Sequence, residues 1–380
     1  MLPLQDIRVL DFSTLLPGPL ASLILAEAGA EVIKVERPGP GEDMRGYPPF
    51  LDGESGSFAI LNRGKRALAL DLRAEGAAAS LLALAPTIDI VLEQFRPGVM
   101  DRLGLGYEAW RAANPRIIYC AITGYGQDGP RAREAGHDMN YQAGAGLLAL
   151  TAGADGSPGI PPALVGDIAG GTYPAVVNLL LALRRRERTG EGCFIDIAMA
   201  ENLFTFQFLG LATGQGAGDW PQPGAGTLTG GSPRYRIYAT GDGRHLAVAP
   251  LEDKFWQAFC DIAGVPQDLR DDSRDPQASI ASVARCVAAH DAAWWEAALA
   301  GKDTCCTVVR TLEEAVRDIH FKARGVFARK VEIPGHVLPA LPVPVVAALR
   351  TREANAPAPR VGEGNEAIIR VPKPWPPRTG

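Results

Sequence analysis

Residues 7–36 read IRVLDFSTLLPGPLASLILAEAGAEVIKVE and contain the pattern that decides the fold. A short apolar run over 7–12 and a second over 31–36 flank a segment of helical character over 18–30. Two short buried strands joined by a helix form a unit in which the strands lie parallel in one sheet. This stretch therefore predicts the first β-α-β unit of a parallel α/β sheet.

The same alternation continues to about residue 125. Apolar runs typical of buried strands occupy 66–72, 88–95 and 116–123, and a helix-like run occupies 74–85. This pattern is typical of a parallel α/β sheet. The turn after the first strand, STLLPGPLAS, lacks the Gly-x-Gly-x-x-Gly that holds a dinucleotide phosphate, so we expect no NAD cofactor.

The remainder of the chain predicts a smaller α+β domain. A helical zone from 138 to about 190 and a strand over 193–199 precede a Gly/Pro-rich stretch at 214–233, which is typical of a linker or a functional loop. A hairpin around Gly-Asp-Gly follows at 235–250, and helical patterns cover 251 to about 300 and 311–318. The predicted divisions are a large Rossmann-like domain over 1–200, a linker over 201–224, a small α+β domain over 225–325, and a return segment to the large domain with the C-terminal tail over 326–380. We expect the Pro/Arg-rich tail after residue 350 to extend over a surface.

Composition limits the partners that the chain can bind. Its formal net charge of −5 argues against nucleic acid, because phosphate binding needs a strong positive field. The longest apolar run, 174–183, is shorter than a membrane span needs, and the first residues show no signal-peptide pattern. The six cysteines form no Cys-x-x-Cys pair, so neither a metal site nor a disulfide framework is indicated. We therefore expect a cytoplasmic protein that uses no metal.

Residues 135–141 read AGHDMNY and place His137 and Asp138 between a glycine and a helix-like stretch. One interpretation is that Asp138 caps a helix beginning near Met139 and that His137 is incidental. The other is that the turn exposes an imidazole whose pKa can be tuned. The local residues leave both interpretations open.

Two further carboxylates stand where helices are expected to begin. Asp167, in PALVGDIAGGTYPAVV, could be an N-cap, or it could be a base or nucleophile held ionised at a helix N-terminus. A helix N-terminal amide beside Asp167 could then stabilise an enolate oxygen. Glu252 follows the hairpin, and taken alone it is a favourable acid in the first turn of a helix.

Three arginines, Arg37, Arg96 and Arg102, each follow a strand-like segment. Solvent-exposed surface positions are the simplest interpretation. However, arginines at the carboxyl edge of one parallel sheet would form a phosphate-binding rim, where α/β proteins usually hold their ligands.

Taken together, these segments resemble the class III CoA-transferase and α-methylacyl-CoA racemase superfamily over essentially the first 330 residues. The motifs that carry the resemblance, in order, are IRVLDFSTLLPGPLASLILAEAGAEVIKVERPG, NRGKRALALDL, EQFRPGVMDRLGLGYE, NPRIIYCAITGYGQDGP, AGHDMNYQAGAG, LVGDIAGGTY, GGSPRYRIYATGDGRHLAVAPLE and DTCCTVV. The resemblance implies a large Rossmann-like domain, a small domain, and two chains interlocked like the links of a chain. It also implies an active site between the large domain of one chain and the small domain of the other.

The resemblance implies an acyl-CoA thioester as the substrate, with no cofactor beyond its CoA moiety. Residues that match the family's CoA-binding set are Arg37, Leu70, Arg73, Phe95 and Arg102. Two positions depart from family patterns. Val308 stands where many racemases have proline after a cysteine, and Gln94 replaces an asparagine common in transferases.

Within the superfamily, the sequence is more similar to the racemase branch. Transferases usually carry tyrosine at the position of His137, whereas racemases carry Gly-His-Asp followed by an Asn-Tyr-like pair, as this chain does. By this resemblance, His137 and Asp167 are the acid/base pair, Glu252 is hydrogen-bonded to His137, and Asp138 belongs to the same catalytic set.

These residue types suit epimerisation next to a thioester, because one base on each face can remove and return the α-proton. Three hypotheses follow. The first is an α-methylacyl-CoA racemase. The second is a CoA-transferase in which Asp167 attacks the thioester and CoA passes to an acid acceptor through an enzyme-bound thioester. The third is an idle acyl-CoA-binding protein that has kept the fold.

Overall fold

The computed structural model describes residues 1–151, 157–353 and 355–369, and these form two compact units. Unit 1 comprises Met1–Ala145, Pro162–Phe206 and the described residues from Ile319 onward. Unit 2 comprises the described part of Gly146–Pro161 together with Gln207–Asp318. Each unit has its own hydrophobic core, so each is described by itself.

Unit 1 is built on a six-stranded parallel sheet with the strand order β5-β2-β1-β6-β7-β8. Its strands are β1 (Arg8–Asp11), β2 (Glu31–Glu36), β5 (Arg66–Ala69), β6 (Ile90–Glu93), β7 (Ile118–Thr123) and β8 (Cys193–Ala198). The predicted parallel sheet is confirmed. The strand order reverses between β1 and β6, and open α/β sheets bind ligands outside the carboxyl ends of the strands at such a point.

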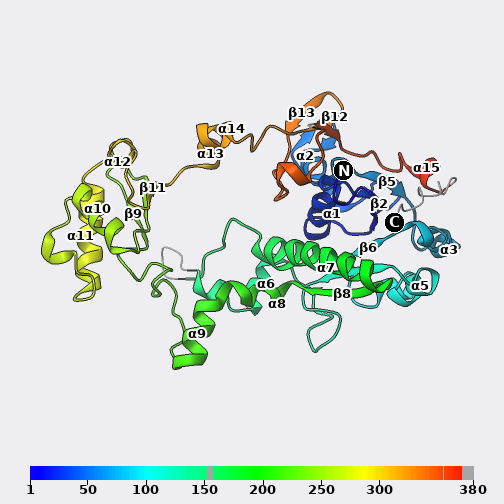
Figure 1. The fold of residues 1–380 in the computed structure, drawn as a ribbon, viewed down its shortest axis with the longest axis horizontal. Helices are drawn as coiled ribbons and strands as arrows, with labels where there is room; N and C mark the ends of the chain where they lie inside the picture. The colour runs from blue at the N-terminus through cyan, green and yellow to red at the C-terminus, as the bar shows by residue number, and fades with distance from the viewer. Residues whose placement is uncertain (152–156, 354, 370–380) are drawn as a thin grey trace. The chain divides into compact units, whose positions relative to one another are not determined.

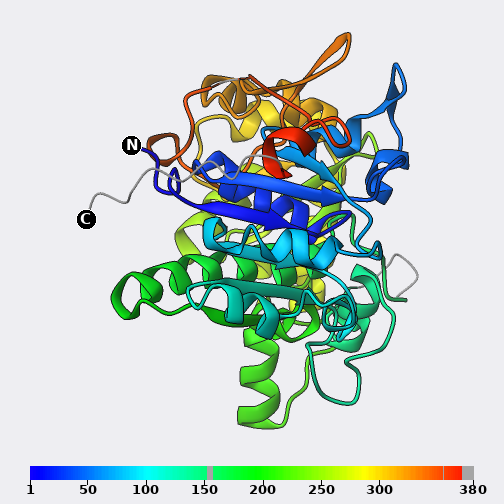
Figure 2. The same ribbon diagram turned by 90° about the vertical axis from the view of Figure 1, so that its right-hand side faces the viewer.

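Helices cover both faces of this sheet, as Figures 1 and 2 show. On one face, α1 (Pro17–Glu27) contacts β1, β2 and β6, and α7 (Tyr173–Thr189) contacts β7 and β8. On the other face, α3 (Ala77–Leu82) and α5 (Tyr107–Ala113) contribute to the main core. Leu10, Leu68 and Trp110 are fully buried in that core, and burying each such side chain stabilises the fold by about 2 kcal/mol.

The helical segment Gly166–Thr189, which includes α7, is long and apolar enough to cross a membrane by length and composition alone. The same properties fit a helix that packs on a sheet, and this segment packs on one. Ala175 and Leu179 are fully buried. Arg186, near the end of α7, is also buried and pairs with Asp89 at 2.9 Å.

The described residues after 350, which we expected to extend over a surface, make specific contacts with unit 1. β14 (Asn355–Pro357) pairs with β12 (Lys330–Ile333), and the Asn365 side chain makes two hydrogen bonds with the backbone of Ala69 at the end of β5. Ile368 is buried in the main core. Asn365 and Ile368 thus anchor this segment to unit 1, and the end of the tail, 370–380, lies outside the described residues.

Unit 2 contains a small antiparallel sheet of β9 (Arg236–Ala239), β10 (His245–Val248) and β11 (Cys306–Val308). The predicted hairpin is β9–β10, and β11 was not predicted as a strand. The helices α10 (Asp253–Ala263), α11 (Pro276–Ala288) and α12 (Ala292–Leu299) enclose a core around Trp256, Phe259 and Trp295. Within the range expected to be a linker, α9 (Phe208–Ala217) is a helix.

Several shorter elements complete the described chain. In unit 1 they are β3 (Phe50–Leu51), β4 (Glu54–Ser55), α2 (Gly56–Asn62), α4 (Val99–Arg102), α6 (Asp138–Gly144), α8 (Met199–Asn202), α14 (Ile319–Ala323), β13 (His336–Pro339) and α15 (Asn365–Ile369). In unit 2 there is also α13 (Leu312–Arg317).

Candidate active site

His137 is the residue at which α6 is capped. Its backbone is extended, and the Asn140 side-chain oxygen accepts a hydrogen bond from the His137 N–H at 3.0 Å. The imidazole is left exposed. Asp138 is the first residue of α6, so the interpretation of Asp138 as the cap was wrong by one position. The helix start therefore presents the imidazole at its tip.

Asp138 links this helix start to Asp167. It is buried, and its two carboxylate oxygens have different partners. One oxygen accepts from the Asp167 N–H at 3.0 Å, and the other accepts from the Gln142 side-chain amide at 2.6 Å. The His137–Asp138 pair and Asp167 are therefore brought together within unit 1, although they lie about 30 residues apart in the chain.

Asp167 lies in a seven-residue π-helix, Gly166–Thr172, that continues into α7. It is thus inside the first turn, and its interpretation as the N-cap was wrong, because Val165 has that position. The π-helix packs closely on its neighbours. A Cβ at Gly166 would lie 3.0 Å from an Asp138 carboxylate oxygen, and one at Gly170 would lie 2.5 Å from the Met199 carbonyl oxygen. Glycine at both positions is what allows Asp167 to sit against Asp138.

The surroundings of Asp167 bring the pKa of its carboxyl group closer to neutral pH. Burial, followed by repulsion from Asp138, raises the pKa of Asp167 to about 6, whereas His137 acts to lower it. A group with a pKa near the working pH can both accept and return a proton. The pair of His137 and Asp167 is therefore chemically suited to act as acid and base.

The oxyanion position expected beside Asp167 is not available. The Asp167 N–H donates to Asp138, and the Ile168 N–H donates to the Leu164 carbonyl. In contrast, the backbone N–H groups of Asp138 and Met139, at the start of α6, have no acceptor among the described residues. Free amides at a helix start can hold a developing negative charge.

Sequence reasoning missed the role of Tyr141. Its hydroxyl donates to the Gly136 carbonyl at 2.5 Å, and its ring packs edge-on against Tyr125 at 5.4 Å between centroids. A Cβ at Gly136 would lie 2.8 Å from the Tyr141 ring. Tyr141 therefore holds the turn that carries His137, and the signal in the sequence was the combination of Gly136 with an aromatic residue five positions later.

Glu252 belongs to unit 2, where it is the exposed residue that precedes α10. Its side chain makes no capping hydrogen bond there. Its hydrogen bond to His137 stays a prediction.

The residues that match the CoA-binding set follow the carboxyl ends of strands. Arg37 comes directly after β2, Leu70 directly after β5, and Phe95 shortly after β6. Leu70 and Phe95 are half-buried against the main core. The other members, Arg73 and Arg102, are exposed. The set therefore lies along the carboxyl edge that includes the reversal between β1 and β6.

The two arginines nearest these strand ends differ in how firmly they are held. The Arg37 guanidinium donates to the Gly41 carbonyl at 3.1 Å and to the Asp43 carboxylate at 2.5 Å. Arg96 is exposed and forms no ion pair with a described residue. Arg37 is therefore held by its neighbours, whereas the Arg96 guanidinium forms no such ion pair with a described residue.

Gln94, one of the two departures from family patterns, supports the loop after β1. Its side-chain oxygen accepts a hydrogen bond from the Gly18 N–H at 3.0 Å, at the start of α1. The other departure, Val308, is buried in β11 and pairs with Leu246 of β10. Among the described residues, neither Gln94 nor Val308 forms a hydrogen bond with His137 or Asp167.

A buried charge network beneath this loop was also missed. Asp11 accepts hydrogen bonds from Ser13 and Ser22 and lies 3.5 Å from the Lys65 ammonium. Lys34 pairs with Glu42 at 3.1 Å and donates to the Ser13 carbonyl at 2.8 Å. All of these charged side chains are buried. The network fixes the backbone at the carboxyl end of β1, where the sheet reverses.

Comparison with known proteins agrees with this architecture. A family model described as CoA-transferase family III matches residues 4–365. Human alpha-methylacyl-CoA racemase is 37% identical over 337 residues, which cover 87% of this chain and 83% of the human protein. The succinate–glutarate CoA-transferase of Agrobacterium fabrum is 32% identical over 390 residues, covering 97% of this chain and 95% of that protein.

A solved structure shows the same fold. The crystal structure of a CaiB/BaiF family protein from Brucella suis superposes with a TM-score of 0.83 at 28% identity, covering 97% of this chain and 99% of that one. Because the family model spans nearly the whole chain and the relatives carry both racemase and transferase names, the chain belongs to CoA-transferase family III and is an enzyme of that family.

Proposed function

We propose that this enzyme is an α-methylacyl-CoA racemase. It would epimerise the α-carbon of 2-methyl-branched acyl-CoA thioesters by two-base proton transfer through an enolate. The observation that carries the proposal is the connection of His137 to Asp167 through Asp138, whose carboxylate accepts the Asp167 N–H. The similarity to human alpha-methylacyl-CoA racemase supports the same reaction.

In the proposed mechanism, His137 and Asp167 serve as the two bases. The imidazole is exposed, and the raised pKa of Asp167 lets its carboxyl group take a proton from one epimer and return one to the other. The free N–H groups of Asp138 and Met139 are candidates to hold the enolate oxygen. The CoA moiety would lie along the rim that includes Arg37, with no other cofactor.

The proposed assembly is an interlocked homodimer, as the family resemblance implies. In that assembly, Glu252 from the small domain of one chain would hydrogen-bond to His137 of the other. A carboxylate on the second imidazole nitrogen fixes the tautomer and raises the basicity of the first.

The test is hydrogen exchange in deuterated water. One epimer of a 2-methylacyl-CoA is incubated with the enzyme, and mass spectrometry follows deuterium at the α-carbon while chiral chromatography follows inversion. We expect deuterium uptake together with formation of the opposite epimer. Absence of α-deuterium uptake across a panel of acyl chains would exclude the racemase, and CoA binding without any turnover would favour the idle binding protein.

A CoA-transferase is the alternative function, and the similarity to succinate–glutarate CoA-transferase favours it. Asp167 would then attack the thioester carbonyl, release CoA as a thiolate, and form a mixed anhydride. The thiolate attacks the Asp167 carbonyl of this anhydride, which releases the donor acid and leaves an aspartyl-CoA thioester. The acceptor carboxylate attacks that thioester to form a second anhydride, and the released CoA thiolate attacks the acceptor carbonyl, which gives the new acyl-CoA and frees Asp167. Hydroxylamine would trap the activated Asp167 carboxyl group as a hydroxamate, which mass spectrometry detects. Transfer of CoA between labelled acids, without α-deuterium uptake, would establish this alternative.

A further inference from the structure

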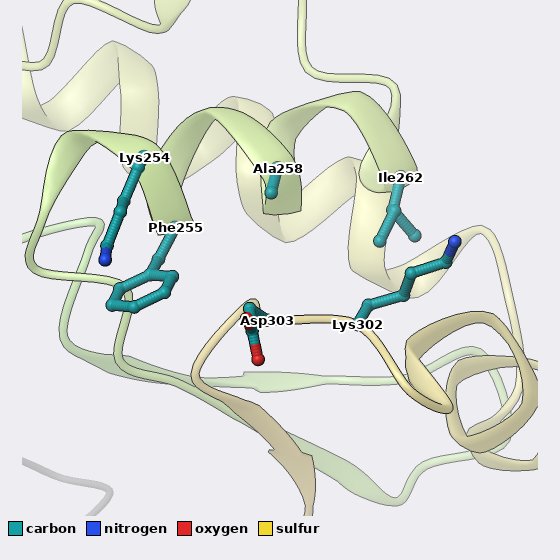
Figure 3. A pocket seen from close by; sticks show the side chains of 6 residues that line it. All are labelled: Lys254, Phe255, Ala258, Ile262, Lys302 and Asp303. Carbon is teal, nitrogen blue, oxygen red and sulfur yellow. The ribbon is translucent and has the colours of Figure 1, made fainter.

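Two hollows in the described residues have neither His137 nor Asp167 in their linings, and they differ in how they are built. The larger, about 410 Å³, lies in unit 2 beside α10 (Figure 3). Lys254 and Lys302 stand on either side of a half-buried apolar floor that includes Phe255. All of its polar side chains are exposed, so nothing in it calls for a particular ligand.

The smaller hollow, about 230 Å³, lies in unit 1 where α5 leaves part of the sheet face uncovered. Aromatic rings from three elements form one wall: Tyr107 of α5, Tyr119 of β7 and Phe194 of β8. The ring centroids of Tyr107 and Phe194 are 5.5 Å apart, and those of Tyr119 and Phe194 are 5.7 Å apart. Phe194, on the edge strand β8, is 39% exposed.

A buried carboxyl group forms the floor of this cavity. Glu93, the last residue of β6, is only 4% exposed and lines the cavity. One of its oxygens accepts the Phe95 N–H at 2.7 Å. No described residue donates a hydrogen bond to the other oxygen, and no described cation pairs with it. The side-chain nitrogen of Gln127, which also lines the cavity, is buried without a hydrogen-bond partner among the described residues.

The groups around Glu93 are mostly acidic. Asp101 of α4 and Asp196 of β8 both act on it electrostatically, and Glu108 of α5 stands at the rim. The only cationic group that lines the cavity is the exposed Arg96. Besides these, Tyr107, Tyr119 and Cys120 of the packed elements can titrate, and all three are neutral near pH 7 because burial raises the pKa of each.

A buried carboxylate without a counter-ion is costly, so it either takes a proton or binds a cation. Burial, and to a lesser extent the neighbouring carboxylates, raises the pKa of Glu93 to about 8. Near neutral pH, Glu93 therefore holds a proton that a cation would displace. The described residues bring together no three side chains that could hold a metal ion, and the carboxylates disfavour an anion.

We propose that this cavity binds a small, flat organic cation, an amidinium or guanidinium group on an apolar body, with Glu93 as its counter-ion. The cation would also lie over the aromatic wall, where the ring faces attract positive charge. On binding, the Glu93 carboxyl group releases its proton to solvent, and the carboxylate then forms charge-assisted hydrogen bonds with the ligand. Neither His137 nor Asp167 lines this cavity, and Glu93 has no part in the proposed reaction.

Isothermal titration calorimetry of the full-length protein with benzamidine tests the proposal. At about pH 7, titrations in two buffers of different ionisation enthalpy should show release of about one proton per bound ligand, and at about pH 9.5 none, since Glu93 is then already ionised. Benzamide, which is neutral and of the same shape, should bind about tenfold more weakly. No benzamidine binding at millimolar concentration, or equal affinity for benzamide, would overturn the proposal.

Variants locate the site. Glu93→Gln should weaken benzamidine binding about tenfold and abolish proton release. Two exposed residues at the rim can be changed without disturbing the core, and the two changes should affect binding in opposite ways. Asp101→Asn should weaken benzamidine binding about threefold, and Arg96→Gln should strengthen it about threefold. Glu313→Gln, the same change of charge on exposed α13, should have no effect. If Glu93→Gln does not fold, the Asp101 and Arg96 variants decide, and unchanged affinity in both would refute the site.

Discussion

At the scale of single residues, His137 and Asp167 offer two chemically different groups that a symmetrical reaction would use in turn. The imidazole of His137 is exposed at the start of α6, while the carboxyl group of Asp167 is half-buried and its pKa is raised to about 6. If each group serves one face of the α-carbon, each should be needed as base for one epimer only.

We therefore expect His137→Ala and Asp167→Asn to lose α-proton exchange with opposite epimers, each by about 10³-fold. Deuterium uptake is measured separately for the two epimers of one 2-methylacyl-CoA. His245→Ala, which changes an exposed histidine of unit 2, is the control and should leave deuterium uptake with both epimers unchanged. Loss of exchange with the same epimer in both catalytic variants would contradict a two-base mechanism.

The raised pKa of Asp167 also has a consequence for stability. A carboxyl group whose pKa rises on folding, here from an ordinary value of 3.8 to about 6, destabilises the folded state when it is ionised. That cost is absent below about pH 4 and complete above about pH 6. Asp167→Asn removes it, and after allowance for partial exposure the gain is about 1 kcal/mol.

We therefore expect Asp167→Asn to melt at the same temperature as the wild type near pH 4 and a few degrees higher near pH 7.5. Thermal unfolding followed by circular dichroism measures the difference across pH. If the difference in melting temperature between Asp167→Asn and the wild type is the same at both pH values, ionised Asp167 does not destabilise the folded state.

At the scale of elements, the loop after β1 is held by charges that are buried beneath it. Asp11 accepts from two serines and faces Lys65, and removing one partner of a buried ion pair leaves the other without compensation. Asp11→Asn should therefore reduce the free energy of unfolding by about 3 kcal/mol. Urea unfolding near pH 7.5 measures it. Glu108→Gln, which breaks the exposed pair with Arg111, should cause no measurable change, and an equally small effect at Asp11 would contradict the role given to the network.

Elements with strong local signals were predictable from the sequence. β2 occupies residues 31–36 as expected, because a strand buried on both faces reads as a continuous apolar run. β11 was missed because it has three residues, and its strand character comes from pairing with β10 rather than from its own composition. The π-helix at Gly166–Thr172 has no local signal, because it depends on close packing against Met199 and Asp138.

The candidate site shows the same limit. His137 and Asp167 were identified from the family resemblance, whereas the link between them through Asp138 could not be predicted, because it joins residues 29 positions apart. Tyr141 was missed because its hydrogen bond to the Gly136 carbonyl makes sense only once the turn is formed. Short-range patterns thus fixed the elements, and the contacts between elements required the structure.

At the scale of the whole molecule, the proposed interlocked homodimer makes a quantitative prediction. If each active site combined His137 from one chain with Glu252 from the other, then a dimer of one His137→Ala chain and one Glu252→Gln chain would contain one doubly altered site and one site with both native residues. Each variant alone would have no complete site.

Co-expression of the two variants would give about half heterodimers, each with one complete site, and so about a quarter of the wild-type activity. Deuterium exchange on the unseparated co-expressed mixture measures this recovery, and two different affinity tags on the two chains measure the share of heterodimers in it. The single-variant homodimers are the baseline, and co-expression of His137→Ala with Asp167→Asn is the matched control. His137 and Asp167 lie in the same unit, so each site takes both residues from one chain. In the control heterodimer, one site therefore lacks His137, the other lacks Asp167, and neither is complete. If the His137 and Glu252 variants fail to complement each other although heterodimers form, then the site does not combine these two residues across chains, and the racemase would have to bring Glu252 to His137 within one chain or work without it.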